Sequence, residues 1–438
     1  MHRLKLYEEK MTTNENLKLW RAEYYESLKN WHEEINKVQL HYADVIQKSW
    51  QKTKYVARNL PFAPDKMVIC PPHSALNLAP NQQHRSDYAT GTWEGSSAEP
   101  ILDKNNNFVG INVILHRQRL ARMMRSLRAR GYDSHIPVEQ FSQMILDVVA
   151  VHGFDMVTAD DGAPARAYIR PSMGTGVGPW GVSFKPNHFI ESSALAFRWG
   201  NYFPEVARVE KEGVRAVIIG AQRMFPVTGK HASNYGAAAM DGSIARNLKY
   251  DELIYLAPYG LKDGNLDFGI RDFDELMRYG VFSDGPGEEI LAILEDGETL
   301  IYPPMRVNRL GGTVLDYIVK HLAPVLGLKV REQDITLEQI RKGEIAGLAF
   351  VGNAVKVTPI AKIDIVKPTP GTYSGEKIET LAEFSIHPTI AKIRDQFLDE
   401  ISGKKKPSHE SLLTPVDLVW GKEYRACLDE FWKNLGFV

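Results

Sequence analysis

The sequence predicts an α/β (α+β) protein of two domains, and two observations carry this prediction. The chain has 438 residues, which is more than one hydrophobic core usually supports. From residue 206 onward, strand-like apolar runs alternate with helical segments, whereas residues 65–200 mix short β-rich pieces with one basic helical stretch, His116 to Arg130. We therefore expect a small mixed domain followed by a larger one.

Four regions are expected along the chain. They are an N-terminal helical extension, a small α/β domain, a large domain and a C-terminal helical segment, at residues 1–64, 65–200, 206–370 and 371–438 respectively. From Leu17 to about Val45 apolar residues recur every three or four positions, which predicts a long amphipathic helix. This helix packs on the protein body or a sister subunit, or it docks another protein. Residues 258–280, which are charged and rich in glycine, are predicted to form a loop inserted between two strands.

Composition excludes several classes of partner and site. The 53 Lys and Arg residues nearly balance the 54 Asp and Glu residues, so no global charge favours nucleic acid or an anionic membrane. Two cysteines are too few for a disulfide framework or a cysteine-built zinc site, so we expect a reducing compartment and no metal. The N-terminus has no apolar signal core, and no apolar run is long enough to cross a bilayer. These features predict a cytoplasmic protein.

One segment carries the most information about chemistry: Lys230-His-Ala-Ser-Asn-Tyr235-Gly-Ala-Ala-Ala. It places a lysine shortly after a strand-like run, and the small residues that follow let a flat ring approach closely. A desolvated lysine loses its proton more readily, and its free amine can form an imine with an aldehyde. By itself such a lysine is more often a solvated surface group, and Tyr235 a core aromatic residue.

Two acids follow in Phe282-Ser-Asp284-Gly-Pro-Gly-Glu-Glu289-Ile. A carboxylate facing a heteroaromatic nitrogen would keep that nitrogen protonated, so that the ring accepts electrons. A solvated acidic turn is the alternative reading of this segment.

Three segments are suited to binding an anion. Arg309-Leu-Gly-Gly312-Thr313-Val314 places glycines before a predicted helix, where amide donors and the helix dipole favour phosphate. Any helix cap has a similar pattern, so this turn alone is a weak signal. Phe350-Val-Gly352-Asn353-Ala354 and His116-Arg-Gln-Arg119-Leu are the other two segments.

The small domain adds candidates for substrate binding. Asp87-Tyr88-Ala-Thr-Gly-Thr-Trp93-Glu-Gly95 is rich in aromatic residues, and Tyr168-Ile-Arg170-Pro171 carries an arginine whose planar fork suits a carboxylate. An ordinary surface ion pair is the alternative for Arg170. Tyr202 follows in the linker between the domains.

Taken together and in order, these segments resemble the active-site motifs of fold type IV, or class IV, pyridoxal phosphate (PLP) enzymes, and of branched-chain amino acid aminotransferases in particular. The resemblance spans roughly residues 84–365. It implies a small mixed domain, a larger pseudobarrel domain, PLP in the cleft between them, and a homodimer.

The resemblance also implies a role for each candidate residue. Lys230 would be the Schiff-base lysine that shuttles the substrate's α-proton, and Tyr235 would bind the phenolic oxygen of the ring. Asp284, or Glu289 in its place, would face the pyridine nitrogen; the family usually has Glu and Asn at these two positions. The residues implied for the phosphate are Arg119, Thr313, Val314, Gly352 and Asn353. Those implied for the substrate are Tyr88, Trp93, Tyr168, Arg170, Tyr202 and Ala354. Ser96 and Ser97 stand where branched-chain enzymes often carry an arginine.

The expected activity is ping-pong transamination between a branched-chain or other hydrophobic amino acid and 2-oxoglutarate, with PLP as cofactor. Two alternatives stay open. One is another fold type IV PLP enzyme, such as a D-amino acid or amine transaminase or a lyase. The other is a noncatalytic relative, which would follow if Asp284 and Glu289 have spoiled the site.

Overall fold

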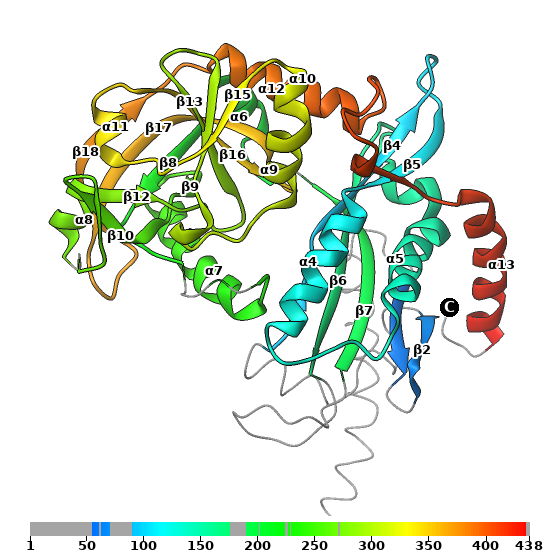
Figure 1. Ribbon diagram of the computed structural model, residues 1–438. Coiled ribbons are helices and arrows are strands. Elements are labelled where there is room, and N and C mark those ends of the chain that lie inside the picture. The colour runs from blue at the N-terminus through cyan, green and yellow to red at the C-terminus, as the bar shows by residue number, and fades with distance from the viewer. Residues whose placement is uncertain are drawn as a thin grey trace, which may run out of the picture. The chain divides into compact units, whose positions relative to one another are not determined.

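The structure is a computed structural model in which one compact unit, residues 53–438, holds all the described residues. The residues that it describes are 55–60, 63–70, 90–175, 190–200, 202–223, 227, 229–269 and 272–434. Figure 1 shows a mixed architecture of helices and several sheets. The helix predicted between Leu17 and Val45, and Tyr88, lie outside the described residues.

The first sheet is antiparallel and carries eight strands within the described part of the chain. In sheet order these are β19 (Leu413–Pro415), β5 (Phe108–Ile114), β4 (Ser96–Leu102), β6 (Arg166–Thr175), β7 (Ile190–Trp199), β1 (Val56–Leu60) and β2 (Ala63–Cys70), with β3 (Thr92–Trp93) paired to β6. Two helices, α4 (His116–Arg128) and α5 (Val138–His152), contact this sheet.

Helix α4 carries site residues into the interior because its buried positions recur at helical spacing. Leu120, Met123 and Leu127 face the core of the first sheet. Arg119, which precedes Leu120, is buried as well. A charged side chain at a buried helix position is unusual unless it meets a partner or a ligand.

The other large sheet also has eight strands among the described residues. Its order is β15 (Lys329–Glu332), β14 (Thr299–Tyr302), β13 (Glu289–Leu294), β16 (Ile345–Gly352), β17 (Lys356–Pro368), β8 (Val214–Ile218) and β9 (Glu252–Leu253), with β18 (Gly375–Glu383) paired to β17. Three pairs are parallel, namely β14 with β15, β17 with β8 and β8 with β9. Strands β13 and β16 are almost completely buried, as near-continuous apolar runs predict.

Helices and short turns complete the described part of this region. They are α6 (Val206–Glu212), α7 (Ala232–Asn247), α8 (Phe273–Tyr279), η3 (Met305–Val307), α9 (Thr313–Tyr317), η4 (Ile318–Leu322), α10 (Ala323–Val325), α11 (Leu337–Arg341) and α12 (Pro388–Ile401). The first sheet and the helices that contact it, called the first lobe below, also include η2 (Gly153–Val157). The C-terminal part adds η5 (Glu410–Leu412) and α13 (Leu418–Asn434).

The prediction of a loop at residues 258–280 is wrong. Strands β10 (Leu256–Lys262), β11 (Asn265–Asp267) and β12 (Gly280–Phe282) form a three-stranded sheet there. Asp263 and Gly264 both have positive φ, 50° and 77°, and close the two-residue hairpin between β10 and β11. An Asp-Gly pair is a strong hairpin signal, which the charge of the segment masked.

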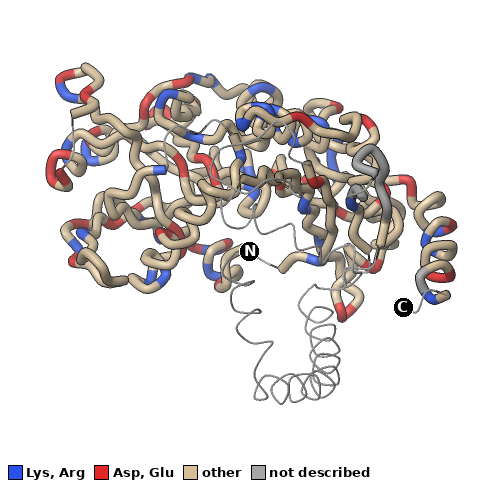
Figure 2. Tube along the Cα trace, turned by 90° about the horizontal axis from the view of Figure 1, so that it is seen from below, with Lys and Arg blue, Asp and Glu red and all other residues tan. Residues whose placement is uncertain are grey.

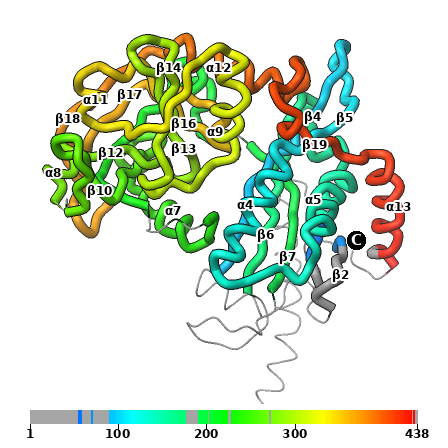
Figure 3. The backbone as a smooth tube through the Cα atoms, viewed as in Figure 1, coloured from blue at the N-terminus to red at the C-terminus, as the bar shows by residue number. Residues whose placement is uncertain are grey.

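The C-terminal segment contributes to both large sheets, and it is not wholly helical as predicted. Strand β18 extends the sheet of β17, and β19 pairs with β5 (Figure 3). Helix α13 packs on α5 so closely that a Cβ on Gly421 would overlap the carbonyl oxygen of Ala150.

Basic and acidic residues are interspersed along the described chain (Figure 2). Among the helices that the structure describes, none combines the length and the apolar character needed to span a bilayer.

Candidate active site

One cavity of about 340 Å³ collects nearly all the residues singled out in the sequence. This volume lies in the range of small-molecule sites. Of the predicted residues, Tyr88 lies outside the described part of the chain, and the other fourteen line this cavity. They are Trp93, Arg119, Tyr168, Arg170, Tyr202, Lys230, Tyr235, Asp284, Glu289, Thr313, Val314, Gly352, Asn353 and Ala354.

Lys230 is held at the start of α7 by contacts from the first lobe. Its carbonyl oxygen accepts from Thr92 Oγ1 at 2.9 Å and from the amide of Trp93 at 3.3 Å. Its own amide donates to Ser126 Oγ at 2.9 Å. Because three hydrogen bonds fix this backbone, the side chain enters the cavity from a defined position.

The amine of Lys230 is buried and surrounded by aromatic rings. Nζ lies 2.5 Å from the hydroxyl of Tyr235, 4.2 Å from the ring centroid of Trp93 and 4.3 Å from that of Tyr235. Burial, assisted by the guanidinium of Arg122, holds the pKa of Lys230 well below its usual value. The lowered pKa favours the neutral amine, which is the nucleophilic form.

Arg119 offers unmet hydrogen-bond donors to the cavity. Its side chain is buried, and one terminal nitrogen donates to the carbonyl oxygen of Gly95. Nε and Nη2 have no hydrogen-bond partner among the described residues. Burial lowers the pKa of Arg119 to about 10, which still leaves it charged at neutral pH. A buried cation with two free donors is a strong site for an anion.

Arg122 lies one helical turn after Arg119 and is already paired. It forms a two-pronged ion pair with Glu94 at 2.7 and 2.8 Å and donates to the carbonyl oxygen of Gly311 at 3.1 Å. Arg122 thereby connects α4 with the turn that precedes α9.

The guanidinium of Arg170 stacks on aromatic rings. Its guanidinium lies 3.9 Å above the ring centroid of Trp93 and donates to the hydroxyl of Tyr168 at 3.0 Å. Nε is buried without a hydrogen-bond partner in the described structure. Stacking on Trp93 leaves the edge of the guanidinium available for a planar acceptor such as a carboxylate.

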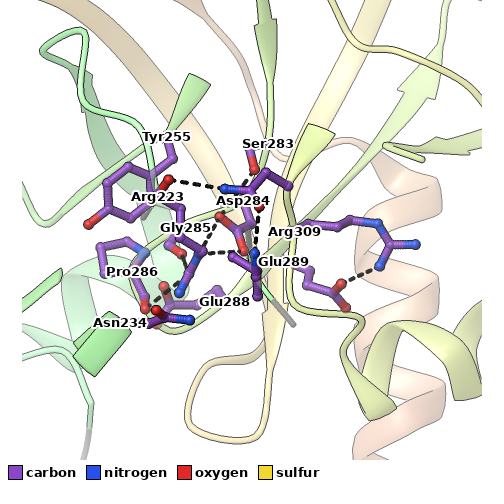
Figure 4. Close-up of polar contacts among 12 residues, drawn as sticks. Arg223, Asn234, Tyr255, Ser283, Asp284, Gly285, Pro286, Glu288, Glu289 and Arg309 are labelled. Carbon is purple, nitrogen blue, oxygen red and sulfur yellow. Dashed lines mark hydrogen bonds and ion pairs between the residues drawn. The ribbon is translucent and has the colours of Figure 1, made fainter. Parts of the chain in front are cut away.

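Each of the two acids that the sequence singled out has its own arginine (Figure 4). Asp284 accepts from Arg223 Nε at 3.0 Å, and Arg223 also donates to the carbonyl oxygens of Gly285 and Pro286. Burial raises the pKa of Asp284 to about 6, and Arg223 opposes this rise. Arg223 Nε lies 3.0 Å from Oδ2 of Asp284 as well, so the arginine contacts both oxygens of this carboxylate.

Glu289 occupies a different place from Asp284. Its carboxylate pairs with Arg309, and a Cβ on Gly312 would overlap Glu289 Oε2. Glu289 therefore lies against the turn before α9, where Arg309 balances its charge.

Tyr202 and two glutamates form a further polar part of the cavity wall. Its hydroxyl donates to Glu252 Oε2 at 2.8 Å, and Glu288 lies beside this pair. Burial raises the pKa of both Glu252 and Glu288, and the negative charge of Glu288 raises that of Glu252 further, so this part of the wall favours a shared proton.

Sequence reasoning did not single out several residues that shape the cavity. A signal existed for Arg122, because it follows Arg119 at the i, i+3 spacing of one helix face. Arg223 and Arg309 gave no such signal, because their pairing with Asp284 and Glu289 depends on how distant strands meet.

The fold is similar to that of solved branched-chain amino acid aminotransferases. The enzyme from Escherichia coli matches with a TM-score of 0.62 and 22% identity, over 84% of this chain and 100% of that chain. The enzyme from the thermophilic archaeon Thermoproteus uzoniensis, with norvaline, has a TM-score of 0.60 and 22% identity, over 83% and 100%. The enzyme from Thermobaculum terrenum, in its PLP form, has a TM-score of 0.60 and 17% identity, over 83% and 99%.

At the level of sequence, no protein-family model and no curated protein matches the chain significantly. At identities this low the structural similarity establishes the fold. It confirms the mixed α/β architecture expected from the motifs.

Proposed function

We propose that the protein is a PLP-dependent aminotransferase that acts on a branched-chain or other hydrophobic amino acid, with 2-oxoglutarate as acceptor and a ping-pong mechanism. The observation that carries the proposal is Lys230. Its buried amine has a lowered pKa and lies 2.5 Å from the hydroxyl of Tyr235, in a cavity with unmet anion donors. The solved enzymes of similar fold are branched-chain aminotransferases, and the one from Thermobaculum terrenum is in its PLP form.

The residues of the cavity fit PLP at four places. Lys230 supplies the amine for the aldehyde, and Arg119 supplies two free donors for the phosphate. The carboxylate of Asp284, buried and paired with Arg223, would accept from the ring nitrogen. Tyr235 would donate to the phenolic oxygen. Thr313, Val314, Gly352 and Asn353 would complete the phosphate site.

When bound, PLP stabilises the electrons left at the substrate's α-carbon after the proton departs. The neutral amine of Lys230 takes that proton and returns it, because burial keeps the amine from being permanently protonated. Arg223 keeps Asp284 ionised against the cost of its burial. Arg170 orients the substrate carboxylate, and the rings of Trp93 and Tyr168 exclude water around it.

The donor preference follows from the apolar surfaces of the cavity. Trp93, Tyr202, Ala354 and Tyr168 line it with aromatic and small apolar groups, which suits an aliphatic side chain. Tyr88 would add a further ring. The homodimer and the cytoplasmic location belong to the same proposal, and light scattering of the purified protein measures the first of them.

A visible spectrum of the purified protein, before and after borohydride, tests this function. We expect a yellow protein whose absorbance above 400 nm, roughly the range of a protonated pyridoxal imine, disappears on reduction and on addition of leucine. A colourless protein that neither takes up PLP nor converts leucine would favour the noncatalytic alternative. A coloured protein that rejects leucine and accepts D-amino acids or amines would favour another fold type IV enzyme.

Arg119→Ala is expected to weaken PLP binding by roughly ten-fold to a hundred-fold, because a charge-assisted hydrogen bond contributes about 1.5–3 kcal/mol. The dissociation constant, measured by titrating the apoprotein with PLP, gives the result. Arg117→Ala on the same helix is the matched control, because Arg117 is exposed. Equal affinity in both variants would remove Arg119 from the phosphate site.

A further inference from the structure

The hairpin turn between β16 and β17 contains a lysine at a position that favours glycine. Gly352 pairs with Lys356 across the three-residue turn Asn353–Ala354–Val355. Lys356 has φ of 58°, a left-handed conformation that a non-glycine residue adopts at a cost. Unlike glycine, lysine also places an ammonium group at this position, and its contacts are specific.

The side chain of Lys356 crosses from this hairpin to strand β4. Nζ donates to Ser97 Oγ at 2.9 Å and to Glu99 Oε1 at 2.8 Å. Ser97 Oγ in turn donates to Asn353 Oδ1 at 3.0 Å. Asn353 lines the cavity that holds Lys230, whereas Lys356 lines a neighbouring cavity of about 1020 Å³.

The charge of Lys356 sets the direction of every hydrogen bond in this chain of contacts. An ammonium group has donors only, so Ser97 Oγ must accept from it. The single proton of the Ser97 hydroxyl then goes to Asn353, whose oxygen must be the acceptor. The amide nitrogen of Asn353 is thereby left as the free end, and it donates to no other described residue.

We propose that Lys356 is a positioning residue, which acts through Ser97 to hold the side-chain amide of Asn353 as a hydrogen-bond donor toward an anionic group in the cavity. The acceptor is an oxygen of a phosphate or of a carboxylate. Its assignment to the cofactor or to the substrate rests on the proposed function.

The surroundings of Lys356 fit this role. Glu99 on β4 balances its charge, while Arg166 on β6 and Arg119 on α4 disfavour it. Burial lowers the pKa of Lys356 to about 8. When the ammonium group loses its proton, the neutral amine can accept from Ser97, and the hydroxyl is no longer obliged to donate to Asn353.

Two binding measurements distinguish the possible anions. Inorganic phosphate and PLP are titrated into the apoprotein, and 4-methylpentanoate, a carboxylate without an amino group, is titrated into the holoprotein. Lys356→Met is expected to weaken binding of either the two phosphate ligands or the carboxylate by roughly ten-fold, as for the loss of an oriented donor to a charged acceptor. The affected ligand identifies the anion. Lys356→Arg, which keeps a permanent cation, is expected to restore most of the affinity.

Ser97→Ala distinguishes the hydrogen bonds through Ser97 from the charge of Lys356. It removes the hydroxyl and leaves the ion pair of Lys356 with Glu99. It is expected to reproduce the effect of Lys356→Met. Lys362→Met is the matched control. Lys362 lies on the same strand, forms an ion pair of 2.7 Å with Glu383, and does not line the cavity. If Lys356→Met and Ser97→Ala bind all three ligands as the parent does, the proposal is wrong.

The dependence on pH provides a readout that a merely structural role would not change. Relative to Lys356→Arg, the parent is expected to lose anion affinity as the pH rises through about 8, because only the parent's cation titrates there. The proposal is refuted if the ratio of the parent's anion affinity to that of Lys356→Arg stays constant from pH 6.5 to 9.5, roughly one and a half pH units on either side of this midpoint. None of the three titrations needs transamination, so they test this proposal even if the proposed activity fails.

Discussion

Lys230→Ala is expected to abolish the adduct that borohydride fixes on the protein and to reduce deamination of leucine by about 10⁴-fold or more. The reason is that this one amine would serve both as the attachment point for the cofactor and as the base for the α-proton. It is the amine that combines burial, a lowered pKa and contact with Tyr235. Mass spectrometry of the reduced, digested protein measures the first effect, and single-turnover kinetics measures the second.

Lys211→Ala is the control for this experiment, because Lys211 is an exposed lysine of α6. It is expected to keep the adduct and the rate. A labelled peptide that carries a lysine other than Lys230 would overturn the assignment of the active site.

The second large effect is expected on stability, from the buried pair of Arg223 and Asp284. Their side chains are 2% and 1% exposed, so removing one partner leaves the other as an isolated buried charge. Arg223→Met is therefore expected to lower the free energy of unfolding by about 3–5 kcal/mol. Denaturant unfolding of the apoprotein measures this loss without any contribution from bound cofactor.

Arg306→Met is the matched control for Arg223→Met. Arg306 pairs with Asp334 but is 51% exposed, so water replaces the lost interaction and the cost is expected to stay below about 1 kcal/mol. Equal losses for the two variants would mean that the Arg223 pair is not a buried ion pair in solution.

The same pair has a chemical role in the proposed function. Asp284→Asn keeps the shape and an acceptor for Arg223 but removes the negative charge. It is expected to leave PLP bound and to slow exchange of the α-proton of leucine by about 10²-fold or more. Glu289→Gln is expected to change this rate less, because Glu289 lies against Gly312 and is paired with Arg309. If Glu289→Gln slows this exchange more than Asp284→Asn does, then Glu289 is the residue that faces the ring nitrogen.

The parts of the site that depend on local sequence could be predicted. Lys230 lies just before α7 and Tyr235 lies in its first turn, so the two residues belong to one short segment and their proximity is local. Asp284 and Glu289 also belong to one segment, and their type alone pointed to charge chemistry. The segments were predicted to share one site only because of their resemblance to a known family.

The parts that depend on pairing between distant segments could not be predicted. Arg223 and Asp284 are 61 positions apart, and Lys356 and Ser97 are 259 apart. No periodicity or spacing connects such residues, because sheet order decides which of them meet. The two errors in the fold have a local cause, since charged residues concealed the strands: β10 is mostly buried but ends at the exposed Lys262, and β18 is largely exposed.

The pairing of β19 with β5 means that the first sheet cannot be completed until the end of synthesis. Leu413 pairs with Ile114 of β5, so about 300 residues are made between the two halves of this strand pair. At about 5–20 residues per second, β5 stays an unpaired edge for roughly 15–60 s after it leaves the ribosome. An open edge strand is a template for pairing with other chains. The nascent first lobe is therefore exposed to aggregation until the C-terminus is released, and a chain that ends before β19 retains this exposure permanently.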